Sequence, residues 1–309
     1  MKKKNFFQRA YTVMEVRTGL ATGLPVLSGG LFGAYLAGEL NIILLGLMFI
    51  AGFCLNIVAN IANEIRAFLK NEENEDTFTD HLGSEGLVRG DARLIDAILV
   101  MIFMLVISGI CGLSIVFITK NINILIIGLI SVLAAICYSL GPKPYIVYPI
   151  GELVSGIFVG AISCFVSAYI QIENANYAIL LYSLISMIMT IFLMSTNNTS
   201  DYEKDKNSRV TLPHVIGFRN SIKIIIPEAI LMIVLWSLLY LTKNITTIIF
   251  LSGLAIYYYY GYVRWYKDYY KIEKVYLEMG KEWGPRPLLL IYSFHLLMSV
   301  EFLIALTIK

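Results

Sequence analysis

Long apolar runs alternate with short polar segments along the whole chain. Nine runs consist mainly of apolar residues and have roughly the 17 to 25 residues that a helix needs to cross a bilayer. They are residues 20–38, 41–62, 94–118, 122–140, 147–172, 177–196, 224–241, 245–263 and 288–308. The pattern predicts an all-α polytopic membrane protein with nine transmembrane helices.

The composition agrees with this pattern. Hydrophobic residues make up 58% of the 309 residues, charged residues only 15%, and the mean hydropathy is +0.72. Soluble domains carry roughly 25% charged residues, so a soluble protein is excluded. All four cysteines lie within apolar runs without metal-ligand spacing, which indicates packing residues and no disulfide framework. We therefore expect the lipid bilayer to be the main partner of this surface, and no nucleic acid.

Positive charges are distributed unevenly between the polar segments. If the N-terminus is cytoplasmic, five segments share that side and hold 21 of the 24 Lys and Arg residues, with only Lys120, Lys243 and Lys309 elsewhere. These segments are 1–19, 63–93, 141–146, 197–223 and 264–287. Because positive residues favour the cytoplasmic side, we predict a multi-pass cell-membrane protein with a cytoplasmic N-terminus and its C-terminus outside.

The sixth apolar run ends in a polar stretch. Asn197, Asp201 and Asp205 are spaced four residues apart, so they form one stripe if the helix of 177–196 continues for one or two turns. Two carboxylates one turn apart repel unless a cation lies between them, and oxygen ligands of this kind suit Mg²⁺ together with phosphate oxygens. The stripe indicates a Mg²⁺-diphosphate site, and the alternative is a solvated acidic loop.

The second apolar run ends in a related pattern. Asn56, Asn60 and Glu64 lie one turn apart on one helix face, with Asn63 beside them. Amides are costly in hydrocarbon unless satisfied, so this end indicates either a polar cavity or hydrogen bonds to a neighbouring helix. The predicted topology puts both polar ends on the cytoplasmic side, where segments 65–93 and 206–223 would act as lids and the active site would face the cytoplasm.

Three basic residues accompany these polar ends. Arg17 stands at the mouth of the first run, Lys143 in the proline-containing turn after the fourth, and Arg209 just after the acidic stripe. Guanidinium groups bind phosphate oxygens in a bidentate way, which makes these residues candidate diphosphate contacts. Arg17 and Lys143 are equally explained as residues that fix the membrane topology.

Glu152, Glu228 and Glu301 are carboxylates that lie inside apolar runs. An intramembrane carboxylate is a functional candidate, and the alternative is a pair with a buried amide or hydroxyl. Secondary transporters bind substrate near the midplane, whereas the main carboxylates here lie at cytoplasmic helix ends. This placement favours an enzyme over a transporter.

The two polar helix ends resemble the motifs of the UbiA superfamily of intramembrane prenyltransferases. The resemblance rests on Asn60-x-x-x-Glu64, on Asp201-x-x-x-Asp205, and on Arg209-Val-Thr-Leu followed by Gly217. It implies one domain over 1–309, with nine helices enclosing a cavity, and a Mg²⁺-dependent transfer of a polyprenyl group from polyprenyl diphosphate to an aromatic quinone precursor. It also implies that Asn60, Glu64, Asp201 and Asp205 hold the metal and that Arg17, Asn56, Asn63, Asn197 and Arg209 bind substrate.

A second set of positions resembles one branch of that superfamily. Tyr138-x-x-Gly-Pro, then Gly151-Glu152-Leu and Phe158-Val-Gly, are similar to the enzymes that prenylate 1,4-dihydroxy-2-naphthoate for menaquinone synthesis. The resemblance implies a demethylmenaquinol product, loss of CO₂, and catalytic roles for Tyr138, Lys143 and Glu152. The alternatives are a 4-hydroxybenzoate or other quinone- or haem-precursor acceptor, or a transporter or binding protein on the same fold.

The chain departs from the family pattern at four positions. Glu64 replaces an aspartate, Phe68 takes the next place on the same stripe, Ala67 stands where the menaquinone branch has a further aspartate, and Ser200 stands where an arginine is usual. Glutamate ligates Mg²⁺ as aspartate does, so the first change keeps the metal chemistry.

Overall fold

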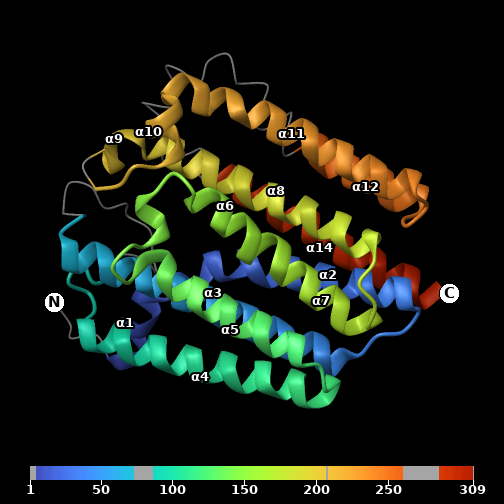
Figure 1. The fold of residues 1–309 in the computed structure, drawn as a ribbon, viewed down its shortest axis with the longest axis horizontal. Helices are drawn as coiled ribbons and strands as arrows, with labels where there is room; N and C mark the ends of the chain where they lie inside the picture. Colours follow the sequence, from blue (N-terminus) through green and yellow to red (C-terminus); the bar gives the residue numbers. More distant parts are fainter. Residues whose placement is uncertain (1–4, 73–85, 207, 260–284, 309) are drawn as a thin grey trace. The chain divides into compact units, whose positions relative to one another are not determined.

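The computed structural model describes residues 5–72, 86–206, 208–259 and 285–308, and every regular element in those ranges is helical (Figure 1). The elements are α1 (Phe6–Val13), α2 (Val16–Ala37), α3 (Ile42–Lys70), α4 (Leu94–Thr119), α5 (Ile122–Ser139), the 3-10 turn η1 (Tyr145–Val147), α6 (Gly151–Ser155), the π-helical segment η2 (Gly156–Ile162), α7 (Ser163–Ile172), α8 (Tyr177–Ser200), α9 (Tyr202–Asp205), α10 (Leu212–Ile216), α11 (Phe218–Leu241), α12 (Thr247–Ile256) and α14 (Pro285–Ile308).

Eight helices of the described part are long and apolar enough to cross a membrane. They correspond to eight of the nine predicted runs, with α6, η2 and α7 forming one of them, so the all-α polytopic fold is confirmed. The run predicted at 245–263 contains the short apolar helix α12, and its last residues lie outside the described ranges. The count of nine, the enclosed cavity and the sides of the two termini stay predictions.

Parts of both predicted lid segments belong to long helices, and their role as lids stays a prediction. Residues 65–70 continue α3, and residues 218–223 already belong to α11. The extension of α3 follows from its composition, because Glu64, Arg66, Ala67, Leu69 and Lys70 are all good helix formers. Most of the first lid, residues 73–85, lies outside the described ranges.

The chain divides into two compact units, and each is described by itself. Unit 1 comprises Met1–Thr22 and Leu47–Val147, and unit 2 comprises Gly23–Gly46 and Tyr148–Lys309. The prediction of one domain over the whole chain stays a prediction.

The core of unit 1 joins α1, α3 and α4. Val13, Ile57, Ile61, Leu87 and Ala97 are buried together in one apolar cluster. An ion pair fixes α1 to the start of α4, since Arg9 Nε lies 2.8 Å from Asp96 Oδ2 and Asp96 is only 1% exposed. Arg93 Nη2 lies 2.9 Å from the other carboxylate oxygen of Asp96. Buried carboxylates need such partners, so this group determines where α1 lies in unit 1.

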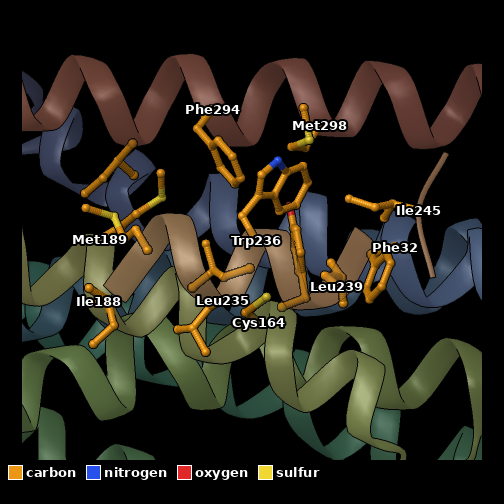
Figure 2. Close-up of a cluster of buried hydrophobic side chains, with 14 of the residues drawn as sticks. Phe32, Cys164, Ile188, Met189, Leu235, Trp236, Leu239, Ile245, Phe294 and Met298 are labelled. Carbon is orange, nitrogen blue, oxygen red and sulfur yellow. The ribbon is translucent and has the colours of Figure 1, made fainter. Parts of the chain in front are cut away.

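The core of unit 2 surrounds α8, which packs most extensively against α11. Figure 2 shows Trp236 of α11 among Phe294 and Met298 of α14, and the Trp236 and Phe294 rings meet edge to face with centroids 5.3 Å apart. A Cβ atom at Gly160 would lie 2.6 Å from the Ser186 carbonyl oxygen, so a glycine is needed where η2 approaches α8. Such small-residue contacts allow dispersion forces to hold membrane helices together.

One polar contact joins α2 and α14 within this apolar core. The Ser28 hydroxyl and His295 Nδ1 share a hydrogen bond of 2.7 Å, and both side chains are almost fully buried. In hydrocarbon each group would be costly alone, so each is the main polar partner of the other among the described residues.

Candidate active site

The end of α3 carries a ladder of amide hydrogen bonds within unit 1. Asn56 Nδ2 donates to Thr22 Oγ1 over 2.8 Å, and Asn60 Nδ2 donates both to Thr18 Oγ1 and, over 3.1 Å, to Asn56 Oδ1. Because its amide nitrogen is used twice, Asn60 has a fixed orientation. Its amide oxygen accepts no hydrogen bond from any described residue and remains the atom suited to a cation.

Glu64 lies one turn further along the same face. Its side chain is 8% exposed, and Oε1 accepts a hydrogen bond of 2.6 Å from the Leu87 backbone N–H. Asn63 is half-buried beside it, and its amide oxygen has no hydrogen-bond partner among the described residues. These contacts are consistent with the prediction that Asn56, Asn60 and Glu64 share one face of α3. The alternative of hydrogen bonds to a neighbouring helix applies to the amide nitrogens of Asn56 and Asn60, which donate to α2.

Backbone hydrogen bonds of helical spacing continue past the end of α8 at Ser200. Asp201 N–H donates to Asn197 O over 2.9 Å, Asp205 N–H to Asp201 O over 2.8 Å, and Arg209 N–H to Asp205 O over 3.0 Å. These three bonds keep the i to i+4 spacing, although α8 ends at Ser200 and Asp201 stands between it and α9 with a non-helical backbone. Asn197, Asp201 and Asp205 occupy successive turns, as their spacing indicated.

Charges along this stripe are balanced locally. Arg209 Nε lies 3.4 Å from Asp205 Oδ1, with side-chain exposures of 12% and 5%. Glu203 lies off the stripe: its side chain is 63% exposed, and its Oε2 lies 3.8 Å from Lys206 Nζ. Asp205 at the end of α9 therefore lies in a largely buried ion pair, which argues against a fully solvated acidic loop at this residue.

His214 supports this region and lies outside the stripe. Its Nε2 is 2.8 Å from the Tyr202 carbonyl oxygen, its Nδ1 is 2.9 Å from Thr211 Oγ1, and its ring stacks on Tyr202 with centroids 4.6 Å apart. Both ring nitrogens are thus in use between α9 and α10. His214 therefore has a structural role in α10.

Two intramembrane carboxylates reach the same turn of α8 in unit 2. Asn198 Nδ2 donates to Glu152 Oε1 over 2.6 Å, and Ser195 Oγ donates to Glu228 Oε1 over 2.8 Å. Glu152 is 3% exposed and belongs to α6, directly before the π-helical segment η2. The alternative of a pair with a buried amide or hydroxyl therefore applies to both carboxylates, without excluding a role for their other oxygens.

The remaining candidate residues lie in unit 1. Arg17 is exposed in the first turn of α2, Lys143 is exposed in the turn after α5, and Tyr138 is half-buried near the end of α5. Their assigned roles stay predictions.

Among the described residues, no three His, Cys, Asp or Glu side chains gather into a metal-binding group. Each polar helix end instead offers one or two carboxylates together with amide oxygens. This donor set fits Mg²⁺, which takes oxygen ligands, keeps several waters and uses substrate phosphate oxygens in addition to a few carboxylates.

Several supporting residues went unrecognised in the sequence. Thr18 and Thr22 are four residues apart in the first apolar run, so their spacing was an available signal. The Leu87 donor is a backbone N–H, which leaves no trace in side-chain patterns.

The chain matches the sequence model of the UbiA prenyltransferase family over residues 23–280. That match covers most of the chain, and the chain therefore belongs to the UbiA prenyltransferase family. It is a multi-pass membrane prenyltransferase of that family, as the resemblance of the two helix-end motifs implied.

Two curated relatives carry the same description. The chain is 25% identical over 227 residues to the 1,4-dihydroxy-2-naphthoate octaprenyltransferase of Bacillus subtilis (strain 168), covering 72% of this chain and 71% of that protein. It is 24% identical over 191 residues to the protein of the same name from Escherichia coli (strain K12), covering 61% of this chain and 62% of that protein.

Solved structures show the same fold. A UbiA homolog from Archaeoglobus fulgidus bound to GPP and Mg²⁺ matches with a TM-score of 0.68 and 16% identity, covering 97% of this chain and 99% of that one. A digeranylgeranylglyceryl phosphate synthase matches with a TM-score of 0.64 and 19% identity, covering 98% and 99%.

Proposed function

We propose that this enzyme transfers a polyprenyl group from polyprenyl diphosphate to 1,4-dihydroxy-2-naphthoate, releasing diphosphate and CO₂ and giving demethylmenaquinol. The observation that carries the polyprenyl-diphosphate part is the stripe Asn197–Asp201–Asp205, in which Asp205 is buried beside Arg209 and the other two residues are half-buried. The choice of acceptor is supported by the two relatives named for this reaction and by the segment from Tyr138 to Glu152.

The oxygen ligands for Mg²⁺ would come from Asn60, Glu64, Asp201 and Asp205. The donor chemistry of both helix ends fits this ion, and homologs from Archaeoglobus fulgidus are described as bound to Mg²⁺ with GPP or DMAPP. When bound, the ion would neutralise charge that develops on the diphosphate leaving group. Asn60 is already oriented for this task, because Thr18 and Asn56 hold its amide nitrogen.

Basic side chains would neutralise the rest of the diphosphate charge. Arg209 lies beside Asp205, and Arg17 and Lys143 are exposed residues. Positioned cations stabilise a leaving group as its bond to carbon breaks. Asn56, Asn63 and Asn197 would add amide contacts to the same substrate.

The acceptor ring would be handled by Glu152 and Tyr138. Glu152 has one oxygen fixed by Asn198, so its second oxygen has a defined direction. A carboxylate held in this way can accept the proton of a ring hydroxyl while the electron-rich ring carbon attacks the allylic carbon. In the naphthoate case the carboxyl group at that carbon then leaves as CO₂.

The reaction would take place at the cytoplasmic side of the membrane. The uneven distribution of Lys and Arg supports this orientation. The apolar helices would surround the polyprenyl tail.

An acceptor panel tests the proposal. The purified enzyme is given Mg²⁺, polyprenyl diphosphates of several chain lengths, and either 1,4-dihydroxy-2-naphthoate or 4-hydroxybenzoate, and products are identified by mass. We expect a decarboxylated prenyl naphthoquinol. A product formed only from hydroxybenzoate, with its carboxyl carbon retained, would refute the naphthoate acceptor, and absence of diphosphate release with every acceptor would refute the reaction.

A further inference from the structure

The turn that precedes α4 is packed into the core of unit 1. Asp91 N–H and Ala92 N–H both donate to the Gly86 carbonyl oxygen, over 2.7 Å and 2.9 Å, and Gly90 N–H donates to the Leu87 carbonyl oxygen over 3.1 Å. The Leu87 side chain is 2% exposed within the apolar cluster of α1, α3 and α4. This segment, residues 86–92, is therefore a fixed element and is called the clamp turn below.

The clamp turn lies directly against α1. A Cβ atom at Gly86 would lie 2.4 Å from Thr12 Oγ1 and 2.9 Å from the Thr12 carbonyl oxygen, so only glycine fits. Thr12 Oγ1 is itself fixed, because it donates to the Arg9 carbonyl oxygen over 2.7 Å. Since Arg9 is paired with the buried Asp96, the position of the clamp turn is determined by α1 and the start of α4.

The clamp turn reaches Glu64 through a backbone group. Leu87 N–H donates to Glu64 Oε1 over 2.6 Å, a short bond of the charge-assisted kind. A glutamate has three flexible side-chain torsions, and ordering them carries an entropic cost. Because Leu87 N–H already holds one oxygen of Glu64, the side chain is ordered when the protein folds. Ligand binding then carries no further entropic cost for ordering Glu64.

We propose that the clamp turn, through Gly86 and the Leu87 N–H, is a positioning element that holds the Glu64 carboxylate ready for the divalent cation and diphosphate. This inference rests on the proposed function, in which Glu64 is a metal ligand. Thr12 and Gly86 act through Leu87, and Leu87 acts through Glu64, so none of the three touches substrate.

The first test measures cation binding directly. The Gly86→Ala enzyme is titrated with Mn²⁺ in the presence of polyprenyl diphosphate without acceptor, and free Mn²⁺ is read by electron paramagnetic resonance. We expect Mn²⁺ affinity to fall by about three- to tenfold, as for one side chain that must be ordered on binding. The rate at saturating Mg²⁺ should stay within about twofold, since the ligand itself is unchanged. The matched control is Gly112→Ala in α4, where a Cβ atom meets no other atom within 4 Å.

A double-mutant cycle separates positioning from general damage. Glu64→Asp keeps a carboxylate but shortens the side chain by one methylene, which breaks the contact with Leu87. If Gly86 acts through that contact, Gly86→Ala adds no further loss of Mn²⁺ affinity in the Glu64→Asp background. Additive losses would overturn the proposal.

Hydrogen exchange gives a second readout that needs no Gly86 variant. The Leu87 amide should exchange slowly in the wild type and at least tenfold faster in Glu64→Asp, whereas equal rates would overturn the proposal. Mn²⁺ binding by the wild type also distinguishes failure of this inference from failure of the proposed function. A wild type that binds Mn²⁺ no better than Gly86→Ala overturns the inference only, and a wild type that binds no Mn²⁺ with polyprenyl diphosphate overturns both.

Discussion

The two polar helix ends hold their oxygen atoms by different means. At the end of α3, the Asn56 and Asn60 amides donate to the Thr22 and Thr18 hydroxyls. The Glu64 carboxylate accepts a hydrogen bond from the Leu87 backbone N–H. At the end of α8, the carboxylate of Asp205 is held by the charge of Arg209 on the following turn. The first end is preorganised by geometry, and the second by charge balance.

This difference predicts that the ends of α3 and α8 affect different properties of the enzyme. Hydrogen bonds of fixed geometry keep their orientation when a charged ligand arrives, whereas an ion pair responds to the new charge. We therefore expect changes at the end of α8 to act mainly on turnover and diphosphate affinity. Changes at the end of α3 should act mainly on the affinity for the cation.

The largest effect is expected for the α8 stripe. Asp201→Asn or Asp205→Asn removes the negative charge of a proposed Mg²⁺ ligand. Either change should lower turnover by at least about 10³-fold, with expression and helix content unchanged. Diphosphate release measures the loss. Glu203→Gln is the matched control, because Glu203 is 63% exposed, and it should stay within about twofold. Full activity in both aspartate variants would refute the metal assignment.

A smaller effect is expected for Glu64→Gln. Turnover at a fixed Mg²⁺ concentration should fall by about 10²-fold, since a neutral amide oxygen is a weaker ligand than a carboxylate. The amide oxygen can still accept the Leu87 N–H, so thermal stability in detergent should be preserved. Loss of stability together with unchanged turnover would show that Glu64 is a packing residue.

The next effect concerns Arg209. Arg209→Gln should raise KM for polyprenyl diphosphate by about 10- to 30-fold, because a charge-assisted contact to phosphate oxygens is lost. Lys206→Gln is the control, since Lys206 is 63% exposed and lies on a different face. An unchanged KM in Arg209→Gln would remove Arg209 from the diphosphate contacts.

The smallest effect is expected for the support of Asn60. Thr18→Val keeps the shape of the side chain but removes the hydroxyl that orients the Asn60 amide, and should raise the Mg²⁺ concentration for half-maximal activity by about tenfold. Thr119→Val, whose hydroxyl bonds only to Ile115 of its own helix, should have no such effect. Equal behaviour of the two variants would indicate that the Asn60 orientation is unimportant.

Most of the helical fold could be predicted because hydrocarbon imposes a strong rule on sequence. A run of about 20 apolar residues has few alternatives to a membrane helix, and eight such runs are helices of sufficient length. Helix ends were less predictable. Residues 65–70 follow the polar end at Asn63 and Glu64, where the pattern predicts a loop, yet they continue α3 because most of them are good helix formers.

The turn-by-turn spacing of candidate residues was predictable where i to i+4 hydrogen bonding persists. Asn197, Asp201 and Asp205 keep this spacing across the break between α8 and α9, because backbone hydrogen bonds link them. The contact between Glu64 and Leu87 was not predictable, because a backbone donor 23 residues away depends on how the turn packs. The Asn198–Glu152 and Ser195–Glu228 pairs likewise depend on which helices lie beside α8.

The bond between Ser28 and His295 has a consequence for how the protein is made. The two residues are 267 positions apart, so at about 5 to 20 residues per second the ribosome adds His295 roughly 13 to 53 seconds after Ser28. Until then the Ser28 hydroxyl of α2 lacks its hydrogen bond to His295. Completion of unit 2 should therefore wait for the final helix, and chains stopped at residue 284 should be cleaved by added protease faster than the full chain. Equal protection of both would show that the early helices mature on their own.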